Sequence, residues 1–307
     1  MLNRYLTSYS PAIQFVIFCG LLSFSMFIGA YLFELLATQL TGLSLSEIND
    51  LKTIPAAMAD NIKIINTSAL IVTLIIPAFL FAYLAYPSPT TYLGLTNNVK
   101  GAHLALAFVL ILVAIPFTGL LEQWSKLIPA MGNSKEADEQ YNRLAEAMLQ
   151  GTTSKDLFSN IFFISIAPAL IEEIFFRGCL QQILLNWMRK TPFAAIFLVA
   201  ALFSLFHWQL SGFFPRLFLG LLLGLAYYYS GSLWVSILMH AINNFVSVLL
   251  IFLFNTKTIA MDITQLPNVN MWVGAGSGIA VCGIVYLFYK DRKECTLWEV
   301  EREPPIF

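Results

Sequence analysis

The sequence predicts an all-α fold, a polytopic bundle of about eight transmembrane helices in a single domain over residues 1–307. Of the 307 residues, 58% are hydrophobic and only 11% are charged, which is more apolar than an ordinary soluble domain. The apolar residues also form runs of about 20, the length that a helix needs to cross the hydrocarbon core. The short alternating segments of a membrane β-barrel are not seen. An integral membrane protein is therefore expected.

Eight segments are candidate spans because each is an apolar run. In chain order they are roughly residues 12–36, 68–86, 102–121, 157–188, 192–210, 214–229, 233–254 and 271–289. The sixth is short, and the fourth is long enough to tilt or to extend past the membrane. Between the third and the fourth, residues 133–151 place Ala137, Tyr141, Leu144 and Met148 at helical spacing among charged residues. We expect an amphipathic helix there, which either rests on the membrane interface or forms a lid over a site.

Lysine and arginine residues in the short loops predict the orientation in the membrane. With the N-terminus inside, the inner side collects Arg4, Lys100, the pair Arg189 and Lys190, and the cluster Lys290, Arg292 and Lys293. We therefore expect both termini in the cytoplasm, and the compactness of the chain suggests a prokaryotic plasma membrane. The formal net charge is −1 and no face-wide basic stripe exists, which argues against a nucleic-acid partner. We expect the lipid bilayer to be the environment of the chain.

A few ionisable and amide side chains lie inside the predicted spans. A charge at that depth costs about 2.5 to 3.5 kcal/mol on insertion scales and marks a functional site by default. The residues are Glu172, Glu173 and Arg177 in the fourth segment, His207 in the fifth, and His240, Asn243 and Asn244 in the seventh. Near span ends, where a side chain can reach the interface, lie Glu34, His103 and Arg216.

Helix spacing separates the two adjacent glutamates. Glu173 and Arg177 are four residues apart, on one face and in the order that favours an ion pair. Glu172 points about 100° away from Glu173 and is left free to act as a general base or acid. His240 and Asn244 are likewise four residues apart. A carboxylate, two imidazoles and a carboxamide from three helices would supply a base for water and donors for an oxyanion. The alternative is that these groups only join helices together.

Three motifs carry a family resemblance: EEIFFR at residues 172–177, FSLFH at 203–207 and HAINN at 240–244. They resemble the EExxxR, FxxxH and HxxxN motifs of the CPBP family. These are the CAAX-protease and bacteriocin-processing intramembrane proteases, also called the Abi family and related to type II CAAX prenyl endopeptidases. The motifs occur in family order, and we expect a catalytic core at about 157–254.

The resemblance implies an intramembrane endopeptidase that hydrolyses a peptide bond of a membrane-associated or lipidated peptide or protein. It implies catalytic roles for four residues and a supporting role for two. Water activation would be carried out by Glu172 and His207, oxyanion stabilisation by His240 and Asn244, and the supporting pair would be Glu173 and Arg177.

Metal dependence and other classes of function remain open at this point. A zinc-dependent protease is one alternative, because Glu172, His207 and His240 could supply three ligands and leave a fourth position open. The sequence has no HExxH helix, and a glutamate-activated water needs no cofactor, so metal-independent hydrolysis is preferred. Another alternative is a non-catalytic bacteriocin-immunity or peptide-binding membrane protein. A transporter with a proton relay is disfavoured, because the paired, Gly- and Pro-broken spans of inverted-repeat transporters are not seen.

Overall fold

The computed structural model describes residues 2–51, 53–96, 98–127, 135–260 and 269–292. These residues contain helices and no β-strand, which confirms the predicted all-α class. Besides the long helices described below, shorter ones occur at the start of the chain and in the connections. They are η1 (Leu2–Ser8), α2 (Leu45–Asp50), η2 (Ala56–Met58), α5 (Pro89–Tyr92) and α8 (Lys135–Leu149).

Six helical segments in the described ranges are long and apolar enough to cross a membrane. They are α1 (Pro11–Thr41), Ala56–Ala85, α6 (Gly101–Lys126), Ser154–Trp187, α14 (Leu233–Asn255) and α15 (Met271–Lys290). The segment Ala56–Ala85 contains α3 (Ala59–Leu70), η3 (Ile71–Ile75) and α4 (Ile76–Ala85). The remaining two predicted spans correspond to the shorter helices α12 (Pro192–Leu205) and α13 (Phe213–Ser230), so the count of about eight is approximate.

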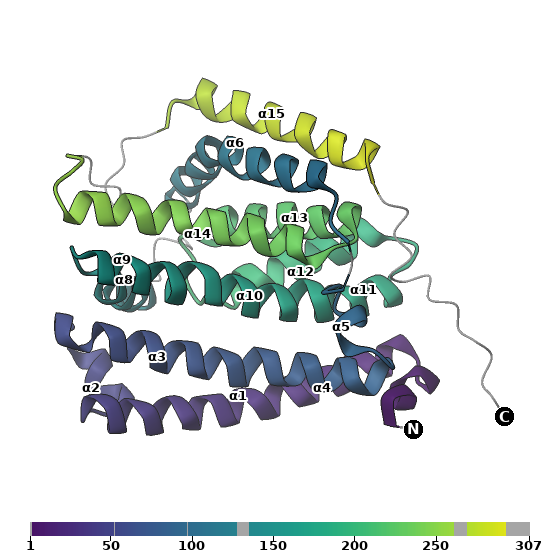
Figure 1. The fold of residues 1–307 in the computed structure, drawn as a ribbon, viewed down its shortest axis with the longest axis horizontal. Coiled ribbons are helices and arrows are strands. Elements are labelled where there is room, and N and C mark those ends of the chain that lie inside the picture. The colour runs from purple at the N-terminus through teal and green to yellow at the C-terminus, as the bar shows by residue number, and fades with distance from the viewer. Residues whose placement is uncertain (1, 52, 97, 128–134, 261–268, 293–307) are drawn as a thin grey trace.

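Figure 1 shows the helices stacked in layers, with α15 and α6 on one side and α1, α3 and α4 on the other. Between them lie α12, α13, α14 and the long segment Ser154–Trp187. Buried apolar residues form one cluster that includes α4, α11 (Gln182–Trp187) and α12, and a second among α6, α13, α14 and α15. The middle layer is therefore packed on both sides, and it contains all the polar residues of the three motifs.

The hairpin of α12 and α13 reverses inside the bundle. Its first helix has 14 residues, a length of about 21 Å, which is shorter than the hydrocarbon core of about 30 Å. Gly220 lets the two helices approach closely, because a Cβ there would lie 3.0 Å from the Cβ of Ala200. The Ser204 hydroxyl donates to the Phe213 carbonyl at 2.7 Å and closes the reversal at residues 206–212. The reversal thus places His207 within the bundle.

The segment Ser154–Trp187 contains two π-helical stretches, which flank its central α-helix. Its parts are α9 (Ser154–Asn160), η4 (Ile161–Ile166), α10 (Ala167–Glu173), η5 (Ile174–Gln181) and α11 (Gln182–Trp187). Pro168 has no N–H to donate to the carbonyl of Ile164, four residues earlier. That carbonyl instead accepts from the Asn244 side chain, at 3.4 Å. The Ser165 hydroxyl donates to the Ala241 carbonyl at 2.7 Å, so the first π-helical stretch is joined to α14 by two polar contacts.

Helix η1 and the end of α15 lie at the same end of the bundle (Figure 1). There the Lys100 ammonium donates to Asp291 Oδ1 at 2.9 Å. His103, which we expected to reach the interface, is buried and lies 3.1 Å from Asp291 Oδ2. The arrangement agrees with termini on one side of the membrane, whereas the assignment of that side to the cytoplasm stays a prediction. Lys293 lies outside the described residues.

Helix α8 forms where the amphipathic pattern predicted a helix. Its Ala147 is buried in a cluster with Ile62 and Ile65 of α3. On another part of its surface, the Tyr141 ring lies 5.9 Å from the Arg216 guanidinium of α13. Helix α8 is therefore anchored on one side of the bundle and reaches the α12–α13 reversal on another.

Candidate active site

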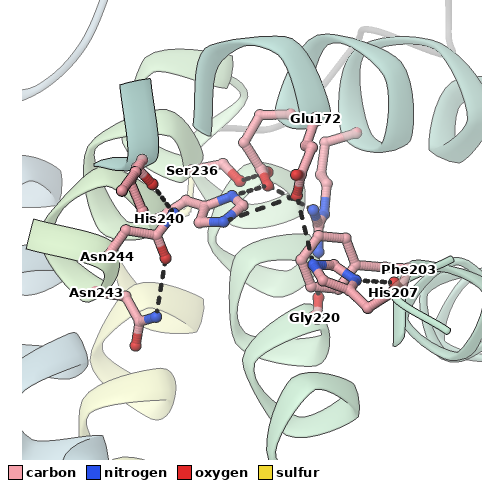
Figure 2. A network of polar contacts seen from close by, with 11 residues as sticks. Glu172, Phe203, His207, Gly220, Ser236, His240, Asn243 and Asn244 are labelled. Carbon is pink, nitrogen blue, oxygen red and sulfur yellow. Dashed lines mark hydrogen bonds and ion pairs between the residues drawn. The ribbon is translucent and has the colours of Figure 1, made fainter. Parts of the chain in front are cut away.

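The carboxylate of Glu172 lies between two imidazole rings (Figure 2). Its Oε2 atom is 4.0 Å from His207 Nε2 and 3.9 Å from His240 Nε2. This oxygen is buried and makes no hydrogen bond with the protein. The two separations are too long for direct hydrogen bonds, but they suit two groups that share one water molecule. The structure thus brings three of the predicted site residues together, from α10, the reversal and α14.

Glu173 has the opposite environment, because each of its oxygens is occupied. Its Oε1 accepts from Arg177 Nη1 at 2.5 Å and contacts His240 Nδ1 at 2.9 Å, while Oε2 accepts from the Ser236 hydroxyl. Glu173, Arg177 and Ser236 are fully buried. The predicted pair of Glu173 and Arg177 is present, and its contact with His240 ties it directly to the site. Removing one member of such a buried pair costs about 3–5 kcal/mol, because the other charge is left uncompensated.

Phe203, the aromatic residue one helical turn before His207, packs against the charged and ring-bearing residues of the site. The Arg177 guanidinium lies 4.5 Å from the centre of the Phe203 ring. The same ring packs edge-on against His207 and His240, with centroid distances of 4.9 and 5.7 Å. Phe203 is therefore the common apolar support of the buried cation and of both imidazoles.

Hydrogen bonds fix which nitrogen of His207 carries the proton. Its Nδ1 lies 2.8 Å from the carbonyl oxygen of Phe203. A carbonyl only accepts hydrogen bonds, so Nδ1 is the donor. In the neutral ring, Nε2 then carries the lone pair, and this atom faces Glu172. His207 is thus oriented to accept a hydrogen bond from a water molecule beside Glu172.

His240 is held in a similar way by a carboxylate. Its Nδ1 contacts Glu173, so Nε2 points toward Glu172. A carboxylate at this position fixes the orientation of the ring. When the ring is protonated, Nε2 becomes a hydrogen-bond donor in the space beside Glu172.

Asn244 lies on α14 one turn after His240, but its amide is partly occupied. Its Nδ2 donates to the Ile164 carbonyl at 3.4 Å, and its Oδ1 accepts from Asn243 at 3.3 Å. An amide nitrogen has two N–H groups, so one donor remains after the bond to Ile164. In this structure Asn244 fixes the first π-helical stretch to α14.

Ser236 is a site residue that the motif analysis missed. Its hydroxyl orients the carboxylate that holds His240, and it precedes His240 by four residues on α14. The signal was the helical spacing itself, since residues 236, 240 and 244 recur every four positions and share a face. A serine in an apolar span is nevertheless common as a partner of backbone groups.

The metal alternative required Glu172, His207 and His240 to act as ligands. Among the residues that the structure describes, no group of three or more His, Cys, Asp or Glu side chains is arranged so that it could hold a metal ion. Metal dependence stays a question for experiment, and the proposed chemistry uses the protein groups alone.

A family model described as Type II CAAX prenyl endopeptidase Rce1-like matches residues 154–246. This segment is similar to the Rce1-like family. The Rce1-like segment begins with α9, ends within α14 and contains every residue of the site described above. The match confirms the family resemblance that the three motifs predicted. Neither a curated protein nor a solved structure matches the chain.

The Rce1-like segment and the apolar helices together define the broad class of the chain. With six helical segments of membrane-spanning length among the described residues, it is an integral membrane protein. The family match supports a CAAX-type intramembrane protease that acts on peptide or protein substrates.

Proposed function

We propose that this protein is an endopeptidase that hydrolyses a peptide bond of a membrane-associated or lipidated substrate with a water molecule activated by Glu172. One observation carries the proposal: a buried carboxylate oxygen of Glu172 has no protein partner and is flanked by two imidazole nitrogens at about 4 Å. A buried polar atom without a partner is rare in proteins and indicates a missing water or ligand. Residues 157–254 form the proposed catalytic core.

The first step is attack by water. The water molecule donates one hydrogen bond to Glu172 Oε2 and the other to His207 Nε2, which orient its oxygen toward the substrate carbonyl carbon. As the C–O bond forms, a water proton passes to Glu172. The carbonyl oxygen gains the electron pair and becomes an oxyanion. Glu172 then delivers the proton to the amide nitrogen as the C–N bond breaks, which leaves a carboxylic acid and a free amine.

Two donors stabilise the oxyanion in this proposal. The first is the Nε2–H of His240 when its ring is protonated, with the ring held in place by Glu173. The second is the N–H of Asn244 that remains after its bond to Ile164. Both side chains come from one face of α14, while the base comes from α10. The peptide carbonyl would therefore be bound between these two helices.

The substrate is proposed from the family match. The description of the matching family makes a prenylated CAAX peptide the first candidate, and the membrane location agrees with a lipidated chain. We further propose a prokaryotic plasma membrane with both termini in the cytoplasm, as the loop charges predict.

Cleavage by the detergent-purified full chain tests this function. Wild type is incubated with a farnesylated CAAX peptide and with its unprenylated twin, and products are identified by mass. Glu172→Ala is the inactive variant, and Glu34→Gln, an exposed glutamate of α1, is the control. We expect cleavage by wild type and control only, with rates unchanged by EDTA. Activity that EDTA abolishes and zinc restores would contradict the metal-free mechanism. Peptide that binds equally to wild type and Glu172→Ala but is never cut would indicate a binding or immunity protein.

A further inference from the structure

Arg216 is a partly buried cation that our mechanism does not use. It lies in the first turn of α13, directly after the reversal that carries His207. Its Nη1 donates to Gln209 Oε1 at 2.6 Å, and its Nη2 donates to the Gln209 carbonyl. The guanidinium packs against Gly212, where a Cβ would lie 2.4 Å from Nη1. Arg216 thus fills the space above a glycine and binds the reversal, although its position near a span end predicted a side chain at the interface.

The guanidinium nevertheless has unused donors. A guanidinium carries five N–H groups, and the two contacts with Gln209 occupy two of them. The Nε atom is buried and has no hydrogen-bond partner. Among the described residues, no carboxylate oxygen lies within 4.0 Å of a guanidinium nitrogen of Arg216, so Arg216 forms no ion pair there. A buried donor of this kind is costly unless a ligand or a water molecule satisfies it.

The unsatisfied donor lies beside the catalytic groups. Arg216 is close enough to interact electrostatically with Glu172 and with His207. It also interacts with Asp138 of α8 and Glu122 of α6. The guanidinium therefore lies near the α12–α13 reversal, α8 and the site. We expect a substrate bound at Glu172 to come close to it.

The surrounding charges decide which kind of substrate group fits. The carboxylates of Asp138, Glu122 and Glu172 already interact electrostatically with the single positive charge. One oxygen of Asp138 is also buried without a hydrogen-bond partner. A further anion would be repelled by these carboxylates, whereas a neutral carbonyl oxygen accepts a hydrogen bond without adding charge.

We propose that Arg216 is a substrate-binding residue whose free guanidinium N–H donates to a backbone carbonyl of the peptide, close to the bond that is cut. This rests on the proposed protease function and adds a binding contact to that same site. Gln209 holds the guanidinium in place, and because Arg216 directly follows the reversal that carries His207, the bound carbonyl is positioned relative to the attacking water.

Binding to an uncleaving protein tests the proposal separately from catalysis. In a Glu172→Gln background, fluorescence anisotropy measures the Kd of a labelled, farnesylated CAAX peptide. We expect Arg216→Gln to weaken binding by about tenfold, whereas the control Arg143→Gln stays near the parent value. Arg143 is the arginine of α8 that binds the Asn49 carbonyl. Arg216→Lys keeps the charge but lacks the Nε–H, so it should weaken binding too, and it serves if Arg216→Gln does not fold.

Two changes in the peptide identify the group that is bound. Each backbone carbonyl of the peptide is replaced in turn by a thioamide. One of these replacements should weaken binding to the parent protein, and the same replacement should not weaken binding to Arg216→Gln. Arg216→Gln should weaken the binding of a peptide with a free C-terminus and of a peptide with an amidated C-terminus by the same factor. Unchanged affinity in both Arg216 variants, or a loss confined to the free-acid peptide, would overturn the proposal.

A separate cleavage measurement keeps the two proposals distinguishable. In protein that retains Glu172, we expect Arg216→Gln to raise KM while kcat changes little. Wild type that binds the peptide but never cuts it would contradict the protease function, and the anisotropy comparison would still decide the role of Arg216. A protein that neither binds nor cuts the peptide would contradict both.

Discussion

At the scale of single residues, the site depends on the different surroundings of two adjacent carboxylates. Glu173 is saturated by Arg177, His240 and Ser236, whereas Glu172 keeps a buried oxygen without a protein partner. Glu173 stabilises the buried Arg177 and orients His240. Glu172 has an oxygen that is free to bind a water molecule or a substrate group. Substitutions at the two positions should therefore have different consequences.

We expect Glu173→Gln to destabilise the protein strongly. It removes a charge that compensates the buried Arg177, and breaking such a pair costs about 3–5 kcal/mol. Thermal unfolding in detergent should show a much lower midpoint than in wild type. Glu172→Gln changes a carboxylate oxygen that makes no hydrogen bond with the protein and should lower the midpoint much less.

The double variant Glu173→Gln/Arg177→Met provides the control for charge. It removes both members of the pair, so no buried charge is left uncompensated. Its unfolding midpoint should lie above that of Glu173→Gln alone. A single variant as stable as wild type would show that the buried pair does not hold this region together.

Helix spacing predicted part of the site at this scale and missed part of it. The four-residue interval between Glu173 and Arg177 required them to share a face, and the one-residue offset of Glu172 required it to point elsewhere. The contact between His240 and Glu173 joins two helices, and spacing within one helix carries no information about it. Arg216 was expected at the interface because it lies near the end of a predicted span. The depth of the α12–α13 reversal depends on packing between helices, which spacing within one helix does not show.

At the scale of helices, two features place the site. The short α12 ends inside the bundle and brings His207 to the level of Glu172. The π-helical stretches around α10 widen the helix that carries both glutamates, and such stretches occur frequently at functional sites. Apolar periodicity predicted that these helices exist. It overestimated the length of α12, because the apolar run continues into the reversal as far as Leu210.

Helix α8 is the element whose role is most open to experiment. Its Asn142 accepts from Gln209 of the reversal at 3.2 Å, and Tyr141 lies against Arg216. If α8 is a lid over the site, as its sequence allows, Tyr141→Ala with Leu144→Ala should change turnover of a peptide substrate by roughly tenfold, equivalent to about 1.4 kcal/mol. Unchanged turnover would indicate a helix that only rests on the interface.

At the scale of the whole molecule, the fold separates α8 from η1 and from the end of α15. Helix η1 and the end of α15 share one end of the bundle, and α8 lies toward the other (Figure 1). The composition and the apolar runs predicted the membrane bundle, since about 20 apolar residues have few other stable environments. The order of the layers could not be predicted, because lipid-facing and helix-facing surfaces are both apolar.

Labelling of single cysteines tests the orientation. In a background without the four natural cysteines, Glu139→Cys marks α8 and Lys290→Cys marks the end of α15, and both positions are exposed. With cytoplasmic termini, a membrane-impermeant maleimide added to intact cells should label Glu139→Cys and not Lys290→Cys. The reverse pattern would place the termini outside.

The central claim is that Glu172 activates the attacking water. Its most direct test is the single-turnover rate at which Glu172→Gln cleaves the farnesylated CAAX peptide, compared with the rate of wild type. The thermal unfolding midpoints of the two proteins are compared first, to show that both are folded. Glutamine keeps the shape of the side chain but cannot take a proton, so the rate should fall by about 10²–10⁴-fold. A folded Glu172→Gln protein that cleaves at the wild-type rate would contradict the account.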